Sequence, residues 1–348
     1  MKKRSSVILI ALLLALSGIA VYIYTSKPRM STTSEEEARN FKFKDTAAIT
    51  KIFIADKEGR TSTLKREKKG WVVNDKFNCR SDAVLNLMEA IRYMEVKMPV
   101  EKSMRKSVIR FMSTNALKVE IYAGNERVKQ YYVGPETPDG EGSYLLLSDP
   151  GTGENYKDPY VCFIPGFKGY LEPRFIANEN NWRDRLVLNY IPPQIKEIKV
   201  QHLDSPADSS FSIELLSASQ FKLKSSSGAV LPFEEARMKQ YLGYYQNISY
   251  EALITGMNKH LQDSLAGQKP FCIITINTNS DGAKTYKFFR KQYPGDQDPE
   301  HGIDYTYDPN HLYLRFDDDR EWALIQYFVF GKILVTPLYF QPPVPVKK

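Results

Sequence analysis

The chain has 348 residues, of which 42% are hydrophobic and 26% are charged, values ordinary for a globular protein long enough to form two domains. Its formal net charge is +7, but five basic residues and no acidic ones lie in the first 29 positions, so the rest carries 43 basic and 41 acidic side chains. This nearly neutral body lacks the charge excess typical of nucleic-acid-binding proteins, and we expect no nucleic-acid partner.

The N-terminus predicts a single membrane span. Residues 7–24 are uncharged and mostly apolar, follow a basic block at residues 2–4, and are followed by Lys27 and Arg29. Their length suits a spanning helix, which needs about 17 to 25 apolar residues. Basic residues stay on the cytoplasmic side. We therefore expect a cytoplasmic tail at residues 1–6, a transmembrane signal anchor at 7–24, and a body exported from the cytoplasm.

A cleaved signal peptide is the alternative interpretation of this segment, because Gly18-Ile19-Ala20 supplies small residues at a cleavage position. Residues 21–24 favour the anchor, since they prolong the apolar run beyond that position. No cysteine lies nearby to carry a lipid, so we do not expect a lipoprotein.

An approximate internal repeat follows a polar, acidic tether at residues 25–40. The two copies are the predicted modules, at residues 41–190 and 191–342, with Pro192-Pro193 at the joint and a short tail at 343–348.

The two copies show the same order of predicted elements. Each opens with alternating strands, beginning at residues 49–54 and at 195–200, and Trp71 and Phe221 hold equivalent places. An amphipathic helix follows, capped by Ser81 in the first copy and beginning after Pro232 in the second, and then a second short helix and further strands. The predicted fold class is α+β: two tandem related modules of antiparallel strands with short helices, after one N-terminal transmembrane helix.

The residue types that carry chemistry are dispersed. Cys79, Cys162 and Cys272 stand singly, which favours buried thiols, with one disulfide pair as the alternative. A carboxylate-rich loop could hold calcium but lacks the glycine and the final glutamate of an EF-hand, which favours a solvated loop; its residues are Asp296, Asp298, Glu300, His301, Asp304 and Asp308. We predict no catalytic residue, no metal site and no cofactor.

One segment combines aromatic residues with arginines, which are enriched in binding hot spots. This candidate interaction surface consists of Tyr170, Arg174, Phe175, Trp182, Arg183, Asp184 and Arg185. The alternative is that the aromatic rings fill the core of the module while the charged residues pair locally.

Several segments of the chain resemble sequences of the DUF4340 family of bacterial envelope proteins. They are residues 45–54, 71–74, 96–100 and 166–185. The likeness is to Bacteroidota members, in which Ile-Pro-Gly-Phe precedes Leu-x-Pro-Arg-Phe and Trp-Arg-Asp-Arg, here residues 164–167, 171–175 and 182–185. The family is of unknown function and implies no catalytic residues. Some relatives are associated with gliding-type ABC transport components, so the resemblance implies an accessory role in the envelope. It also implies that the anchor at residues 7–24 lies in a bacterial inner membrane and that the body is in the periplasm.

The leading hypothesis is a non-enzymatic, membrane-anchored periplasmic protein that binds or positions an unidentified envelope protein, in a transport-associated or other assembly. One alternative is an envelope hydrolase or glycan-active enzyme that uses carboxylates brought together only by the fold. Another is a periplasmic ligand-binding protein.

Overall fold

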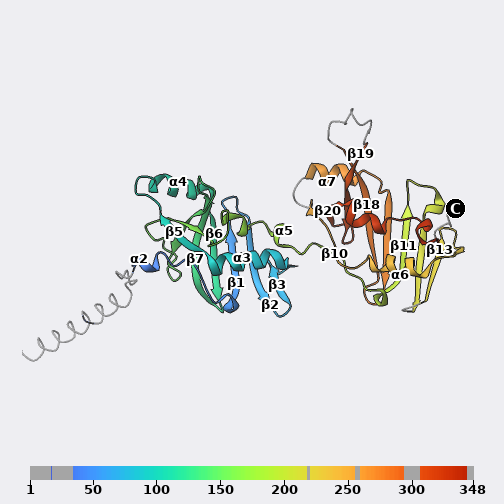
Figure 1. Ribbon diagram of the computed structural model, residues 1–348, viewed down its shortest axis with the longest axis horizontal. Coiled ribbons are helices and arrows are strands. Elements are labelled where there is room, and N and C mark those ends of the chain that lie inside the picture. The colour runs from blue at the N-terminus through green and yellow to red at the C-terminus, as the bar shows by residue number, and fades with distance from the viewer. Residues whose placement is uncertain (1–16, 18–33, 218–219, 255–258, 294–305, 343–348) are drawn as a thin grey trace, which may run out of the picture. The chain divides into compact units, whose positions relative to one another are not determined.

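The computed structural model describes residue 17 and residues 34–217, 220–254, 259–293 and 306–342. The chain divides into two compact units, Met1–Asp184 and Arg185–Lys348 (Figure 1). The division falls before the predicted joint because β10 (Leu186–Leu188) pairs with β15 (Ile248–Ser249) of the second unit.

Within the described residues, each unit is built around one nine-stranded antiparallel sheet. The first sheet has the order β4-β3-β2-β1-β6-β7-β8-β9-β5. Its strands are β1 (Ile49–Ala55), β2 (Thr61–Glu67), β3 (Gly70–Val73), β4 (Phe77–Asn78), β5 (Glu95–Pro99), β6 (Leu117–Ala123), β7 (Glu126–Glu136), β8 (Ser143–Ser148) and β9 (Tyr160–Phe163).

The second sheet repeats this order as β14-β13-β12-β11-β17-β18-β19-β20-β16. Its strands are β11 (Ile195–His202), β12 (Phe211–Ser217), β13 (Gln220–Ser225), β14 (Val230–Leu231), β16 (Ala252–Leu253), β17 (Cys272–Thr278), β18 (Ala283–Gln292), β19 (Tyr307–Phe316) and β20 (Glu321–Gln326). The mostly antiparallel α+β architecture predicted from the sequence is confirmed.

The repeat extends to the pairing of individual residues. Both first strands carry a bulge at the same place, between Ile49 and Lys51 in β1 and between Ile195 and Glu197 in β11. Counting along the ladders from these bulges makes Trp71 of β3 equivalent to Phe221 of β13, as the sequence predicted.

One face of each sheet, here called its core face, is covered by an amphipathic helix. In the first unit α3 (Ser81–Tyr93) packs its buried residues Val84, Leu87 and Ile91 onto the sheet. In the second, α6 (Glu235–Gly243) buries Met238, Tyr241 and Leu242. The apolar residues recur at helical spacing, so each helix presents one stripe to its sheet.

The predicted cap of α3 is wrong. Ser81 is the first helical residue, and the cap position belongs to Arg80, whose side chain makes no capping bond. The Arg80 N–H instead donates to the carbonyl of Trp182 (2.8 Å), which sets where the chain enters the helix.

The opposite face of each sheet, its outer face, carries a smaller apolar cluster beneath a second helix. In the first unit α4 (Arg105–Asn115) buries Val108 and Met112 against Tyr132, Tyr144 and Leu146. In the second, α7 (Lys259–Ala266) buries Leu265 in a cluster with Phe289 and Trp322. Short helices α2 (Ser34–Glu37), α5 (Glu179–Trp182) and α8 (Tyr327–Phe330) complete the described α-helices.

The predicted tether is partly folded. Its last residues follow α2, and Ala38 is buried, while the Lys129 ammonium donates to the carbonyl of Asn40. The predicted cytoplasmic tail, the anchor at residues 7–24 except Ser17, and the tail at 343–348 lie outside the described residues. Among the residues that are described, no helix is both long enough and apolar enough to span a bilayer.

Candidate interaction surface

Two aromatic residues of the predicted interaction surface belong to the core of the first unit. Trp182 is fully buried in α5, and its indole N–H donates to the carbonyl of Ile176 (2.7 Å). Phe175 is 2% exposed and packs edge-on against Tyr131, with 6.0 Å between the ring centroids. Neither side chain can reach a partner in this conformation, so both are removed from the candidate surface.

The charged residues after Trp182 follow the chain as it leaves the first unit. The Arg183 guanidinium stacks on Phe77 at 3.7 Å from the ring centroid, and the Asp184 N–H donates to the carbonyl of Asn78 (2.7 Å). Arg185 belongs to the second unit, where its carbonyl accepts from the Tyr250 N–H. Local contacts therefore hold the backbone of residues 183–185 in place.

Arg174 stays in the candidate surface with its side chain 16% exposed, beside an aromatic ring that the prediction did not include. Its guanidinium lies 4.6 Å from the ring centroid of Phe167, whose side chain is 41% exposed. One guanidinium nitrogen also donates to the Asn86 carbonyl (3.1 Å) and to the Glu89 carboxylate (3.3 Å). Two bonds to α3 thus hold the cation that stacks on the ring. Tyr170, four residues before Arg174, is half-buried.

Leu85 extends this region along α3. It lies one helical turn before Glu89 and is 61% exposed. We call Leu85, Glu89, Phe167 and Arg174 the Phe167 patch. It offers two exposed apolar side chains around one ion pair, on a helix whose other face is anchored in the core.

The turn that displays Phe167 has a signal in the sequence. Gly166 and Gly169 flank the ring and adopt positive φ angles of 81° and 135°. At a φ of 135° an L side chain is strained, and a Cβ on Gly169 would also lie 3.0 Å from the Phe167 ring, so this position favours glycine. The Pro-Gly-Phe-Lys-Gly phrase therefore predicts an aromatic residue presented on a tight turn.

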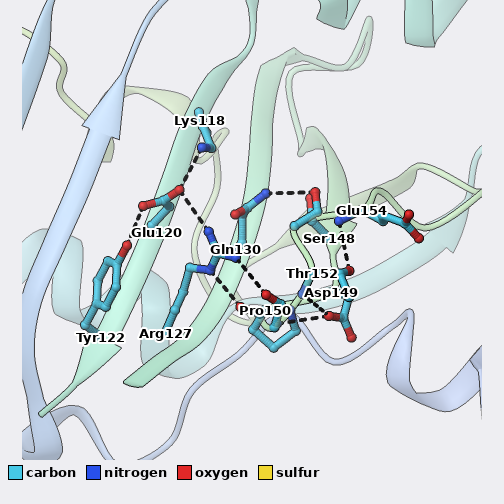
Figure 2. Close-up of polar contacts among 12 residues, drawn as sticks. Lys118, Glu120, Tyr122, Arg127, Gln130, Ser148, Asp149, Pro150, Thr152 and Glu154 are labelled. Carbon is cyan, nitrogen blue, oxygen red and sulfur yellow. Dashed lines mark hydrogen bonds and ion pairs between the residues drawn. The ribbon is translucent and has the colours of Figure 1, made fainter. Parts of the chain in front are cut away.

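A polar network occupies the outer face of the first sheet (Figure 2). Glu120 of β6 accepts hydrogen bonds from Lys118 (2.7 Å) and from the Tyr122 hydroxyl (2.6 Å), and Arg127 of β7 lies 3.3 Å away. Burial by itself raises the pKa of the Glu120 carboxyl, but these donors and charges outweigh it and hold the pKa below its ordinary value.

The same network fastens the loop after β8 to the sheet. Arg127 donates to the Pro150 carbonyl (2.7 Å) (Figure 2). The buried Gln130 amide donates to the Gly153 carbonyl (3.3 Å). Asp149 accepts from the Thr152 N–H (2.6 Å) within the loop. The Glu120 carboxylate is paired with the cations of Lys118 and Arg127, which is typical of a structural network.

A cleft of about 720 Å³ lies between α4 and the β7–β8 hairpin. Glu136 lines it. Nearby, burial and then the charge of Glu136 raise the pKa of Glu172, a residue of the short helix Glu172–Arg174. A buried carboxyl whose pKa is raised by a second carboxyl nearby is an arrangement that general acid catalysis uses.

The cysteines do not form a disulfide. All three are free, and burial raises the pKa of Cys79 and Cys272 to about 12 and also raises that of Cys162. The alternative of one disulfide pair is therefore wrong in this structure, and none of these thiols is an activated nucleophile.

Of the predicted carboxylate loop, only Asp308 is described, and the other five residues lie outside the described part of the chain. Asp308 pairs with Lys291 (2.6 Å) and with the His311 ring (3.1 Å). Over the residues that the structure describes, no three His, Cys, Asp or Glu side chains are grouped to hold a metal ion.

Comparison with protein-family models finds no match, and searches of curated proteins and of solved structures find none either.

Proposed function

We propose that this protein is a non-enzymatic, membrane-anchored periplasmic component of an envelope assembly, which contacts a partner protein through the Phe167 patch. The observation that supports the patch is an exposed phenylalanine stacked on an arginine that α3 holds in place. Aromatic residues and arginines supply most hot spots of protein interfaces, and a preorganised pair loses little side-chain entropy on binding. The DUF4340 resemblance makes an envelope protein, in a transport-associated or other assembly, the proposed partner.

The proposal of an inner-membrane anchor rests on the sequence of residues 1–29. Protease added to spheroplasts should digest the body while the cytoplasmic tail stays protected. N-terminal sequencing of the mature protein should begin at residue 1 or 2, and a start just after Ala20 would replace the anchor with a cleaved signal peptide.

The partner contact is tested with a photo-crosslinking amino acid placed at single positions in intact cells. Positions Phe167 and Leu85 should yield the same adduct, and Ile109, which is 38% exposed on α4, is the matched control. Arg174→Glu should abolish the adduct, because it reverses the charge beside Phe167 and Glu89. An adduct formed equally from Ile109, or one that persists in Arg174→Glu, would contradict the proposed surface.

The second candidate function is glycan hydrolysis with Glu172 as the acid and Glu136 as the second carboxyl. It is favoured by the raised pKa of Glu172 near a cleft that Glu136 lines. Purified protein should then release reducing sugars from envelope glycans, and Glu172→Gln should abolish the activity while Glu89→Gln, on α3, preserves it. Absence of sugar release by the wild-type protein rejects this candidate.

A further inference from the structure

The second unit contains a cavity of about 610 Å³ on the outer face of its sheet. Its wall includes Ala266, at the end of α7, and the segment 268–271. Ile273 of β17 and Phe289 of β18 add apolar surface, and Phe289 is 3% exposed. A cavity of this size with a partly apolar lining can hold a small organic molecule.

Cations outnumber carboxylates around this cavity. Lys269, Lys287, Arg290 and Arg315 line it, whereas Asp204 is the one carboxylate that lines it among the residues that the structure describes. Asp204 accepts two bonds from Arg290, at 3.1 and 2.6 Å. A further carboxylate outside the lining, Asp319, pairs with Lys287 (2.5 Å) and lies 3.7 Å from Arg315 Nε. Even with Asp319 included, the charge of the described residues around the cavity is positive, which favours an anion.

Aromatic rings orient the two guanidinium groups. Arg290 lies 4.6 Å from the ring centroid of Phe271 and 5.3 Å from that of Tyr307, while Arg315 lies 5.2 Å from the Trp322 centroid. Stacking uses the faces of the guanidinium planes and leaves their N–H edges available for hydrogen bonds. Arg315 donates through Nε to the Asp319 carbonyl (3.0 Å), and no bond from its two terminal nitrogens is found within the described residues.

The internal repeat shows that the fold does not require these cations. Lys287 and Arg315 face each other across β18 and β19, and the ladders make them equivalent to Tyr132 and Leu146 of β7 and β8. In the first unit those two apolar residues belong to the cluster under α4. The second unit therefore has two cations where the first unit has apolar packing.

We propose that this cavity is a binding site for a soluble organic anion, a phosphate, sulfate or carboxylate attached to a flat apolar body. Arg315 and Lys287 bind the anionic group, while Ile273, Phe271 and Tyr307 contact the apolar body. The site lies within the second unit and is independent of the Phe167 patch.

The test is calorimetric titration of the full chain, in neutral detergent, with 1-naphthyl phosphate. Inorganic phosphate and 1-naphthol are the probes for charge alone and ring alone, and each should bind much more weakly. Affinity should fall as sodium chloride is added, because the cations lie within reach of solvent. Arg315→Gln should weaken binding about tenfold or more, as expected for loss of a charge-assisted hydrogen bond.

Lys269→Gln is a second variant that does not threaten the fold, because Lys269 is exposed on a loop. It should weaken binding by roughly threefold, the effect of one exposed charge. Arg320→Gln is the matched control, since Arg320 is 69% exposed in the β19–β20 turn and does not line the cavity. Its affinity should equal that of the wild type.

Three results would overturn the site. They are equal affinity of the wild type and both cavity variants, binding of 1-naphthol as tight as that of the phosphate ester, and binding of inorganic phosphate as tight as that of the ester. The thermal unfolding midpoint of each variant confirms that a lost affinity is not lost folding.

Discussion

Replacing Trp182 and Phe167 separately by alanine distinguishes a core residue from a surface residue in the same aromatic segment. Trp182 is fully buried and Phe167 is 41% exposed. Emptying a buried tryptophan site costs about 3 to 5 kcal/mol of unfolding free energy. The lost indole bond also leaves the Ile176 carbonyl without this donor, which adds about 1 kcal/mol. We therefore expect Trp182→Ala to lose about 4 kcal/mol or more, and Phe167→Ala to lose less than about 1 kcal/mol.

Differential scanning calorimetry of both variants measures this difference. For a unit of this size, a loss of 4 kcal/mol lowers the unfolding midpoint by roughly 8 to 16 °C. Trp182→Phe should fall between the two alanine variants, because it keeps most of the volume and loses the hydrogen bond. If the midpoints of Trp182→Ala and Phe167→Ala agree within about 2 °C, the assignment of Trp182 to the core is refuted.

Three further predictions concern stability and reactivity. The ionised Glu120 carboxyl contributes its full stabilisation above its ordinary pKa of 4.5, and this contribution is lost as the pH falls through the lower pKa of the folded state. Urea unfolding at a series of pH values should show this loss of stability in acid for the wild type and not for Glu120→Gln. Gly134→Ala should lower the free energy of unfolding by about 1 to 3 kcal/mol, because a Cβ there would lie 2.9 Å from the Tyr144 carbonyl oxygen. A Cβ on Gly243 in α6 would meet nothing within 4 Å, so Gly243→Ala should leave the stability unchanged or raise it. Thermal unfolding of both variants measures the difference. Cys79 and Cys272, with pKa values of about 12, should resist iodoacetamide at pH 8 until urea unfolds the protein, as measured by mass spectrometry.

The elements of the fold were largely predictable because their signals are local. Period-two alternation identified strands such as residues 49–54 and 195–200, and the repeat located their counterparts, including Trp71 and Phe221. The cap of α3 was predicted wrongly because the Arg80 N–H bonds to Trp182, a residue distant in sequence. A long-range bond of this kind has no local signature.

The candidate surface was only partly predictable. Aromatic residues and arginines are enriched both in cores with local ion pairs and in interfaces, so composition alone could not separate Phe175 and Trp182 from Arg174. Burial separates them, and it depends on which residues the rest of the chain brings near. Leu85 joins Phe167 only because Arg174 bridges their two segments.

The sequence by itself determined the α+β class, the repeated order of strands and helices and the nearly neutral body, because each follows from periodicity or composition along the chain. Only the tertiary structure decided which side chains share a face. It buried Trp182, exposed Phe167 on a glycine-flanked turn, and placed Lys287 beside Arg315 where the first unit has Tyr132 and Leu146. The physical reason is that the register between strands, which is set by long-range hydrogen bonds, determines these neighbours.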